Sequence, residues 1–331
     1  MIVLDADVLG RGRTGEETYV LNLLRSLPAA APELAFGAVT RHPELVPDGV
    51  EAIALPARSQ EIRMAWLLPR LLRRIRPQLL HVQHALPLGW RGPSVVTLHD
   101  LHFERHPHVM SLADRVTFKA VVPRTARRAD HVVAVSERTK RDAVELYHLS
   151  PEKITVVPHG VDPAFGPGDV AGGGGFVLFV GAIQERKDPG AALAAARDVG
   201  VPLVVVGPQK DASLARRLAD DGADVRGFVP QEELVQLYRS AEALVLPSRY
   251  EGFGIPVLEA MASGTPVVWS DDEALSEVAG DAGIYGDLAA GIRRALAERE
   301  RFAKAGLERA RMFTGAEAAR RTTDVYRRVL A

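Results

Sequence analysis

Residues 158–175 read PHGVDPAFGPGDVAGGGG, and the apolar run FVLFV follows at once over 176–180. The first stretch is rich in proline and glycine and has no helical period, which is the composition of a linker. The second has the length of a strand and no polar alternation, which is typical of a strand covered on both faces. We therefore expect one domain to end near residue 165 and a second to begin with a buried strand.

Short apolar runs alternate with segments of helical period on both sides of this linker. The alternation predicts βαβ units and hence two parallel sheets. Because ligands of open parallel sheets bind outside the carboxyl ends of the strands, functional side chains are expected where strands end. The runs lie at 2–4, 79–82, 94–98, 131–135, 176–180, 203–206, 243–246 and 266–269, and the helical segments at 17–27, 66–75, 137–147, 191–198, 213–219, 232–241 and 256–262.

The composition is that of an ordinary globular protein. The chain has 331 residues, which at ~150 residues per domain indicates about two domains; 47% of the residues are hydrophobic and 25% charged. A net charge of −1 argues against a nucleic-acid binder that works by bulk charge. The absence of cysteine excludes disulfides, thiolate metal sites and cysteine nucleophiles. No apolar run reaches the ~18 residues of a membrane span, and the acidic start of the chain predicts no signal peptide.

Charge and histidine are distributed unevenly between the two halves. Residues 1–166 carry 21 Lys and Arg against 18 Asp and Glu, and residues 167–331 carry 20 against 24. All ten histidines fall in the first half, and the chain has six lysines beside 35 arginines. A lysine at the end of a strand is therefore an informative residue.

The most specific segment is 246–266, LPSRYEGFGIPVLEAMASGTP. A strand is expected to end at Leu246, and Pro256 suits the first position of a helix. Glu251 then lies on the loop and Glu259 in the first helical turn, beside the free backbone N–H groups of a helix N-terminus that suit an anion. The alternative is structural, with Glu259 complementing the helix dipole and Glu251 solvated.

Residues 180–189, VGAIQERKDP, follow the first strand of the second half. Gly181 allows a ligand to approach the backbone closely. Arg186 and Lys187 add two cations at the carboxyl end of that strand, where fixed positive charge stabilises an anionic leaving group in the transition state. The alternative for such a pair is a solvated surface.

Two segments of the first half also join a strand to polar residues. In residues 95–103, VVTLHDLHF, a strand is followed directly by His99 and Asp100. In residues 5–19, DADVLGRGRTGEETY, a strand is followed by a glycine-rich loop and a helix, which is the order found in phosphate-binding loops. His99 alone is equally explained as a structural histidine. The Asp5 and Asp7 pair resembles a metal site, but we interpret it as a strand end without a metal.

Together these segments resemble the retaining, nucleotide-sugar-dependent glycosyltransferases of GT-B fold, the large group 1 (family four) type. Within that family they resemble mannosyltransferases. The resemblance implies that Glu251 contacts the donor sugar and Glu259 the ribose hydroxyls, and that Arg186 and Lys187 stabilise the departing diphosphate without a metal. It also implies that His99 touches the transferred sugar or orients the acceptor. The implied catalytic residues are His99, Arg186, Lys187 and Glu251, and the implied substrate-binding residues are Gly15, Asp100, Gly181, Val229, Gly252, Phe253, Gly254, Ile255, Leu258 and Glu259.

The chain departs from the family pattern at three positions. Asp188 replaces the Asn that usually follows Arg-Lys, Glu17 replaces a glycine of the first loop, and His159 replaces Asn in the segment before the linker. Elsewhere Arg13, Thr14, Gly15 and Tyr19 match the first loop.

The resemblance predicts two Rossmann-like α/β domains facing each other across a cleft. They comprise residues 1–165, which bind the acceptor, and 166–315, which bind the nucleotide sugar; a helix over 316–331 returns to pack on the first domain. The expected reaction moves a hexose from a GDP- or UDP-sugar to a glycan, lipid-linked or small-molecule acceptor, with no cofactor, metal or nucleic acid. The alternatives are another nucleotide-sugar enzyme of this fold, an epimerase or phosphorylase, and a non-catalytic sugar-nucleotide-binding partner.

A basic amphipathic segment bears on partners and location. Residues 63–76, RMAWLLPRLLRRIR, combine apolar and arginine faces. Such a segment suits an anionic membrane surface, and equally an ordinary domain helix with an arginine-rich outer face. We expect a cytoplasmic protein, with peripheral contact at the inner membrane face as one hypothesis.

Overall fold

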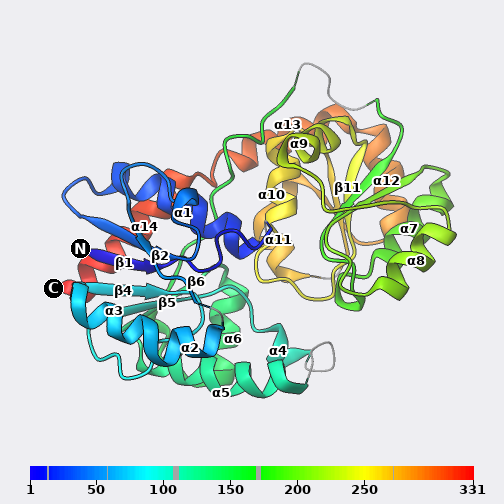
Figure 1. Ribbon diagram of the computed structural model, residues 1–331. Coiled ribbons are helices and arrows are strands. Elements are labelled where there is room, and N and C mark those ends of the chain that lie inside the picture. Colours follow the sequence, from blue (N-terminus) through cyan, green and yellow to red (C-terminus); the bar gives the residue numbers. More distant parts are fainter. Residues whose placement is uncertain (13–14, 58, 107–111, 169–172, 271) are drawn as a thin grey trace. The chain divides into compact units, whose positions relative to one another are not determined.

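The computed structural model describes residues 1–12, 15–57, 59–106, 112–168, 173–270 and 272–331. The chain divides into two compact units (Figure 1). Unit 1 comprises Met1–Gly160 and Thr314–Ala331, and unit 2 comprises Val161–Phe313. Each unit is a parallel sheet with helices on both faces, so the expectation of two α/β domains is confirmed.

Unit 1 is built on a seven-stranded sheet in the order β3-β2-β1-β4-β5-β6-β7, and every neighbouring pair is parallel. The strands are β1 (Ile2–Asp5), β2 (Phe36–Thr40), β3 (Glu51–Ala54), β4 (Leu79–Val82), β5 (Ser94–Leu98), β6 (His131–Ala134) and β7 (Ile154–Val156). The helices are α1 (Gly15–Ala30), α2 (Gln60–Ile62), the π-helix η2 (Arg63–Leu67), α3 (Leu68–Ile75), α4 (His102–Arg105), α5 (Leu112–Arg128), α6 (Glu137–Tyr147) and α14 (Gly315–Leu330), with short 3-10 turns η1 (Pro43–Leu45) and η4 (Pro151–Lys153).

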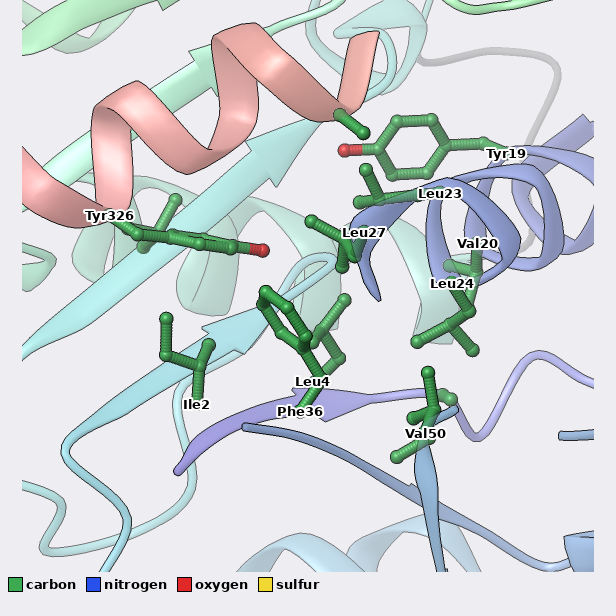
Figure 2. Close-up of a cluster of buried hydrophobic side chains, with 14 of the residues drawn as sticks. Ile2, Leu4, Tyr19, Val20, Leu23, Leu24, Leu27, Phe36, Val50 and Tyr326 are labelled. Atoms are coloured by element: carbon green, nitrogen blue, oxygen red, sulfur yellow. The ribbon is translucent and has the colours of Figure 1, made fainter. Parts of the chain in front are cut away.

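Alternate residues of the central strand β1 enter two different cores, as the period of a strand requires. Ile2 and Leu4 pack with α1 and α14 on one face, whereas Val3 packs with α3, α5 and α6 on the other. Figure 2 shows Tyr19 of α1 and Tyr326 of α14 in the first of these cores. The last helix of the chain therefore completes the core of the first unit.

Unit 2 has a six-stranded parallel sheet in the order β10-β9-β8-β11-β12-β13. Its strands are β8 (Val177–Val180), β9 (Leu203–Val206), β10 (Asp224–Gly227), β11 (Ala243–Leu246), β12 (Val267–Trp269) and β13 (Ile284–Tyr285). Its helices are α7 (Pro189–Val199), α8 (Ala212–Asp220), α9 (Gln231–Ser240), α10 (Ile255–Ala262), α11 (Glu273–Ala279), α12 (Leu288–Ala297) and α13 (Arg299–Ala310), with 3-10 turns η5 (Glu185–Lys187) and η6 (Gly280–Ala282). Helices α7, α8 and α12 cover one face, and α9, α10 and α13 cover the other (Figure 1).

The two connections between the units touch each other. Val161 N donates to Phe313 O at 2.9 Å, and a Cβ on Gly160 would lie 2.4 Å from Gly315 N. Glycine at position 160 is therefore a packing requirement. Within the described residues, no helix is long and apolar enough to cross a membrane.

Candidate active site

Both sheets reverse direction at their centre. In unit 2 the chain runs outward from β8 through β9 to β10 and then returns to β11, on the other side of β8. In unit 1 the same reversal lies between β1 and β4. The carboxyl ends of the strands at such a reversal are where open α/β sheets bind ligands, so these two edges are the candidate sites.

Arg186, Lys187 and Glu251 meet at the reversal of unit 2. The two cations lie in η5 after β8, and Glu251 lies in the loop after β11. The Lys187 ammonium donates to Glu251 Oε1, and Arg186 Nη1 lies 3.8 Å from Glu251 Oε2 while it donates to the Tyr250 carbonyl. Two cations thus share the carboxylate of Glu251.

Glu251 is fixed by neighbours on a third strand end. Its backbone N–H donates to Asp272 Oδ2 at 2.9 Å, and Asp272 caps α11 by accepting from Leu275 N. Burial alone would raise the pKa of the Glu251 carboxyl, but Lys187 and Arg186 outweigh burial and hold that pKa below its ordinary value. Glu251 is therefore ionised at neutral pH and orients both cations.

The loop after Glu251 leads into the N-terminus of α10. Gly254 is the N-cap with a φ of 109°, and a Cβ there would lie 2.6 Å from Leu275 Cδ2, so this turn requires glycine. The side chains of Phe253 and Leu258 are buried in the protein. Any ligand contact from these two residues is therefore limited to their backbone, as we predict for the whole turn Gly252–Ile255.

Glu259 lies deeper in α10 than the sequence predicts. The helix begins at Ile255, one residue before Pro256, so Glu259 is its fifth residue and lies in the second turn; the expected first-turn position was wrong. Its buried carboxylate accepts from the Tyr238 hydroxyl at 2.9 Å. Burial and the nearby Glu259 raise the pKa of Tyr238 well above its ordinary value, so the hydroxyl remains a donor.

The backbone requires glycine at Gly207, after β9, but not at Gly181, after β8. A Cβ on Gly181 would meet only ordinary contacts, the nearest 3.6 Å away on Phe179. Gly207 has a φ of 141°, and a Cβ there would lie 2.1 Å from the Gly181 carbonyl oxygen. The predicted role of Gly181 thus concerns a ligand alone. Val229, one of the implied substrate-binding residues, is buried just after the edge strand β10.

Asp188, the residue that departs from the family pattern, has a structural part. It occupies the left-handed region with a φ of 48°, which Asn and Asp tolerate better than most residues. It caps α7 by accepting from Ala191 N and pairs with Arg249 at 2.9 Å. Aspartate therefore meets the same backbone requirement as asparagine here.

His99 lies among other aromatic rings at the carboxyl edge of unit 1. Its Nε2 lies 2.9 Å from Gln83 Oε1, and its ring meets Tyr19 edge-on and stacks on His159 with centroids 4.9 Å and 5.8 Å away. Burial lowers the pKa of His99 to about 4, so the ring is neutral at neutral pH. With Gln83 in this orientation, Nε2 carries the proton and Nδ1 keeps its lone pair.

An ion pair lies next to His99. His84 Nε2 lies 2.8 Å from Glu16 Oε1, and the His84 and His99 centroids are 5.7 Å apart. Burial would raise the pKa of Glu16, but His84 outweighs it and lowers that pKa to about 2. Burial would lower the pKa of His84, but Glu16 outweighs it and raises that pKa. Both groups are therefore charged in weak acid, beside a neutral His99.

Gly15 and Asp100 also lie on this edge. Gly15 is the exposed first residue of α1, and Asp100 accepts from the His102 backbone N–H at 3.1 Å and from its ring at 2.5 Å. Glu17 Oε1 accepts from Gly10 N at 2.7 Å, so the residue that replaces a family glycine closes the first loop. Arg13 and Thr14, two of the residues that carry the resemblance, lie outside the described residues.

Arginines hold Asp5 and Asp7. Arg63 forms two hydrogen bonds to Asp5, of 2.6 and 3.0 Å, and Arg41 forms two to Asp7, of 2.7 and 2.8 Å. Arg11 also pairs with Asp7 at 3.0 Å. Burial would raise the pKa of Asp7, but these arginines outweigh it and lower that pKa. Across the described residues, no group of three or more metal-ligating side chains is close enough to hold one ion.

Several residues that contact the candidate site residues were not predicted from the sequence. Glu16, Gln83 and His84 surround His99, and Asp272 and Tyr238 hold Glu251 and Glu259. Gln83 and His84 had the same signal as His99, namely polar residues directly after a buried strand. Asp272 precedes a helix and had the signal of an N-cap. Tyr238 had no such signal, because in the sequence it looks like any other residue on the apolar face of α9.

Two family models together match most of the chain. The model described as "Glycosyltransferase Family 4" matches residues 13–165, and the model described as "Glycosyl transferases group 1" matches residues 166–309. The two matches meet at the linker.

Curated relatives agree with these models. The chain is 32% identical to a D-inositol 3-phosphate glycosyltransferase of Actinosynnema mirum, over 88% of this chain and 79% of the relative. It is 34% identical to the enzyme of that name from Nocardia farcinica, over 66% of this chain but only 56% of the relative. It is 28% identical to O-antigen chain mannosyltransferase B of Escherichia coli, over 71% and 70%. The chain thus spans little more than half the length of some of these relatives.

Solved structures share the fold at low sequence identity. Sucrose-phosphate synthase from Thermosynechococcus elongatus superposes with a TM-score of 0.78 at 20% identity, over 99% of this chain and 98% of the other. Anabaena Alr3699/HepE in complex with UDP and glucose superposes with a TM-score of 0.74 at 16% identity, over 99% and 98%. With both halves matched by family models and a relative aligned over most of its length, the chain belongs to the group 1 glycosyltransferases of GT-B fold.

Proposed function

We propose that this chain is a retaining glycosyltransferase that moves a hexose from a nucleoside-diphosphate sugar to an acceptor hydroxyl. Unit 2 binds the donor and unit 1 the acceptor. The observation that carries the proposal is the cluster of Arg186, Lys187 and Glu251 at the sheet reversal of unit 2. Its two cations and the N-terminus of α10 suit a diphosphate.

The residues of unit 2 divide the donor between them in this proposal. Glu251 accepts hydrogen bonds from the sugar hydroxyls and Glu259 from the ribose. Backbone N–H groups of Gly252–Ile255 bind the sugar and the phosphates, with Gly181 and Leu258 adjoining them, and Val229 borders the base. Ordered dipoles and cations that are already in place stabilise the developing charge without reorganisation.

The chemical step breaks one bond and forms another on the same face of the sugar. The bond between the anomeric carbon and the phosphate oxygen breaks, and its electron pair leaves with the diphosphate, whose new charge Arg186 and Lys187 stabilise. The acceptor oxygen bonds to the anomeric carbon and gives its proton to the departing phosphate oxygen. No protein base is then required, and His99, neutral at neutral pH, hydrogen-bonds the sugar or the acceptor.

Unit 1 orients the acceptor through its carboxyl edge. His99 presents Nδ1 as an acceptor of hydrogen bonds, and the ionised Glu16 with His84 lies beside it. Asp100 and Gly15 are further contacts of this edge in the proposal. Paired ionic and neutral hydrogen-bonding groups suit a hydroxyl-rich acceptor, whether a glycan, a lipid-linked sugar or a small polyol.

The donor is a GDP- or UDP-sugar in this proposal. The likeness to a mannosyltransferase favours a mannosyl donor. The likeness in fold to a protein solved with UDP and glucose makes UDP-sugars the second class of donor to test. We also infer that the protein acts in the cytoplasm, and that transfer needs no divalent metal because the two cations take its place.

A donor screen tests the proposal. Thermal shift or saturation-transfer NMR against UDP-, GDP-, ADP- and dTDP-sugars should give a shift with at least one of them. Product analysis by mass spectrometry with and without acceptor should then detect hexose transfer with the anomeric configuration retained. A shift with none of the donors would overturn the proposal.

The same assay separates the rival functions. An epimerase would change the donor without an acceptor, a phosphorylase would require free phosphate, and a non-catalytic partner would bind donor without transfer or hydrolysis. Addition of EDTA should leave turnover unchanged. Loss of turnover on chelation, restored by Mg²⁺ or Mn²⁺, would contradict the metal-free step alone.

A further inference from the structure

Two neighbouring segments of unit 1, the helical stretch 60–67 and the turn after β4, expose three large apolar side chains. Ile62 and Trp66 lie one helical turn apart, and their exposed fractions are 52% and 76%. Leu88 is 69% exposed and joins them, because its backbone N–H donates to Met64 O at 3.2 Å. A cluster of exposed apolar residues marks an interaction surface more often than scattered ones do.

The exposed Trp66 belongs to a π-helix. The segment η2 places Arg63 wholly inside the protein, in its two hydrogen bonds with Asp5, while Trp66 of the same turn stays in solvent. Single π turns interrupt α-helices frequently at functional sites. The arrangement anchors the segment to the end of β1 and leaves its outer side unpartnered.

Unpaired arginines follow on the next turns. Arg70, Arg73 and Arg74 of α3 are exposed, and no carboxylate among the described residues pairs with any of them. We call these three the arginine row. On α14 of the same unit, Arg320 and Arg327 instead pair with Glu317, Asp324 and Glu33. The arginine row therefore places three unpaired cations on one short helix that directly follows the π-helix.

The charge of the surrounding sequence has the same sign. Residues 60–128 contain 12 Lys and Arg against 4 Asp and Glu. Glu61, the exposed sequence neighbour of Ile62, is acidic, but the three arginines of the arginine row outnumber it. An apolar cluster flanked by excess positive charge is complementary to a surface that offers both hydrocarbon and negative charge.

We propose that this surface, made of Ile62, Trp66 and Leu88 with the arginine row, docks unit 1 on an anionic lipid bilayer. Tryptophan and aliphatic side chains enter the boundary between headgroups and acyl chains, and arginines reach the phosphates. Each arginine near such a surface strengthens binding by about fivefold. The proposal goes beyond glycosyl transfer and does not rest on it, since it concerns the location of the protein.

Vesicle cosedimentation with the full chain tests the docking surface. We expect binding to vesicles that contain phosphatidylglycerol at low salt, weaker binding at high salt, and none to pure phosphatidylcholine. The variant Arg70→Gln/Arg73→Gln/Arg74→Gln should bind at least about tenfold more weakly. Absence of cosedimentation of the wild-type chain at low salt would overturn the proposal.

A matched control removes the same charge from unit 2. Arg216, Arg217 and Arg311 are also exposed, and their triple replacement by Gln should leave vesicle binding unchanged. Equal loss from both triple variants would contradict a specific surface and indicate bulk charge instead. Circular dichroism of each variant checks that it is folded.

The apolar part needs its own readout. Trp66→Ser should weaken binding several-fold, whereas Tyr285→Ser, at an exposed aromatic of unit 2, should not. Brominated phosphatidylglycerol should quench the fluorescence of the wild-type chain more than that of Trp66→Phe. Quenching that is equal in the two proteins would contradict the proposal, as would a lipid-free dimer that Trp66→Ser dissociates, because the occupant would then be a second copy.

Discussion

The two sheet reversals of this chain share a topology and differ in charge. At β8 and β11 of unit 2, fixed charges meet, two cations around the buried carboxylate of Glu251. At β1 and β4 of unit 1, the neutral rings of Tyr19 and His159 pack on His99, and the ion pair of Glu16 with His84 lies beside them. Both edges are where a parallel sheet binds ligands.

This difference shows that topology decides where a ligand binds and side chains decide what kind. At the edge of unit 2, Lys187 and Arg186 lower the pKa of the Glu251 carboxyl, so this carboxylate stays ionised at neutral pH. The edge of unit 1 contains groups that titrate in weak acid. The halves should therefore respond differently to substitution and to pH.

The largest effect is expected from the charge cluster of unit 2. Lys187→Ala and Glu251→Ala should each lower turnover at least tenfold, about 1.4 kcal/mol of transition-state stabilisation. Removing one partner of a buried pair also costs ~3–5 kcal/mol of stability, so melting temperatures are measured alongside kcat. Lys210→Ala, at an exposed lysine of the same unit, is the matched control. Turnover like that of the wild type in both variants would remove the cluster from the mechanism.

Acid should destabilise unit 1 and spare unit 2. Burial lowers the pKa of His81 to about 3 and that of His99 to about 4, so both bind protons more tightly when unfolded. Their contribution to stability is present above about pH 6.5 and is lost as the pH falls toward those values. From about pH 7.5 to about pH 5 each should cost ~1–2 kcal/mol. Unit 2, Val161–Phe313, contains no histidine.

Hydrogen exchange at the two pH values, corrected for intrinsic rates, measures each unit separately. His84 works in the opposite direction, since its raised pKa adds stability below about pH 6.5 that is lost as the pH rises, and offsets part of the effect. His99→Asn should reduce the acid sensitivity, whereas His148→Asn, at an exposed position, is the control. Equal loss of protection in both units would refute the contrast.

A smaller effect should follow from the hydrogen bond behind Glu259. Tyr238→Phe removes a buried donor to a carboxylate, a bond worth ~1.5–3 kcal/mol when one partner is charged. If Glu259 binds the ribose, KM for the donor should rise about tenfold while kcat changes little. A fall in kcat at unchanged KM would assign Glu259 to the chemical step instead.

The smallest effect is expected where α14 meets the sheet of unit 1. The Tyr326 hydroxyl lies 2.6 Å from His81 Nδ1, and His81 Nε2 lies 2.7 Å from Thr97 Oγ1, all inside the core. Tyr326→Phe should lower the free energy of unfolding by ~1 kcal/mol, measured by urea titration, and leave donor affinity unchanged. A change in donor affinity would show that the two regions are coupled.

The short apolar runs of the sequence predicted eight of the strands. Strands β1, β4, β5, β6, β8, β9, β11 and β12 all occur where those runs lie. Strands β2 (FGAVT) and β3 (EAIA) have no such run, because β3 is an exposed edge and β2 contains glycine and small residues. Their identity depends on pairing with β1, which no local pattern reports.

The site was predictable as residues but not as contacts. Lys187 and Glu251 lie 64 positions apart, and they meet because β11 pairs with β8 across the reversal. Strand order follows from long-range packing, so spacing alone did not predict that Glu251 neutralises one of the two cations. In unit 1 the neutral state of His99 likewise depends on Tyr19, His84 and His159, which come from three other elements.

The position of α14 also affects how the chain can fold during synthesis. Unit 2 is one continuous segment, whereas the core of unit 1 includes Val325 and Tyr326 near the end of the chain. A ribosome therefore releases all of unit 2 before it delivers the last helix of unit 1. Domains generally fold as units when their sequence is complete. Unit 2 should therefore reach its native state first, and one apolar face of unit 1 should stay uncovered until α14 has been synthesised.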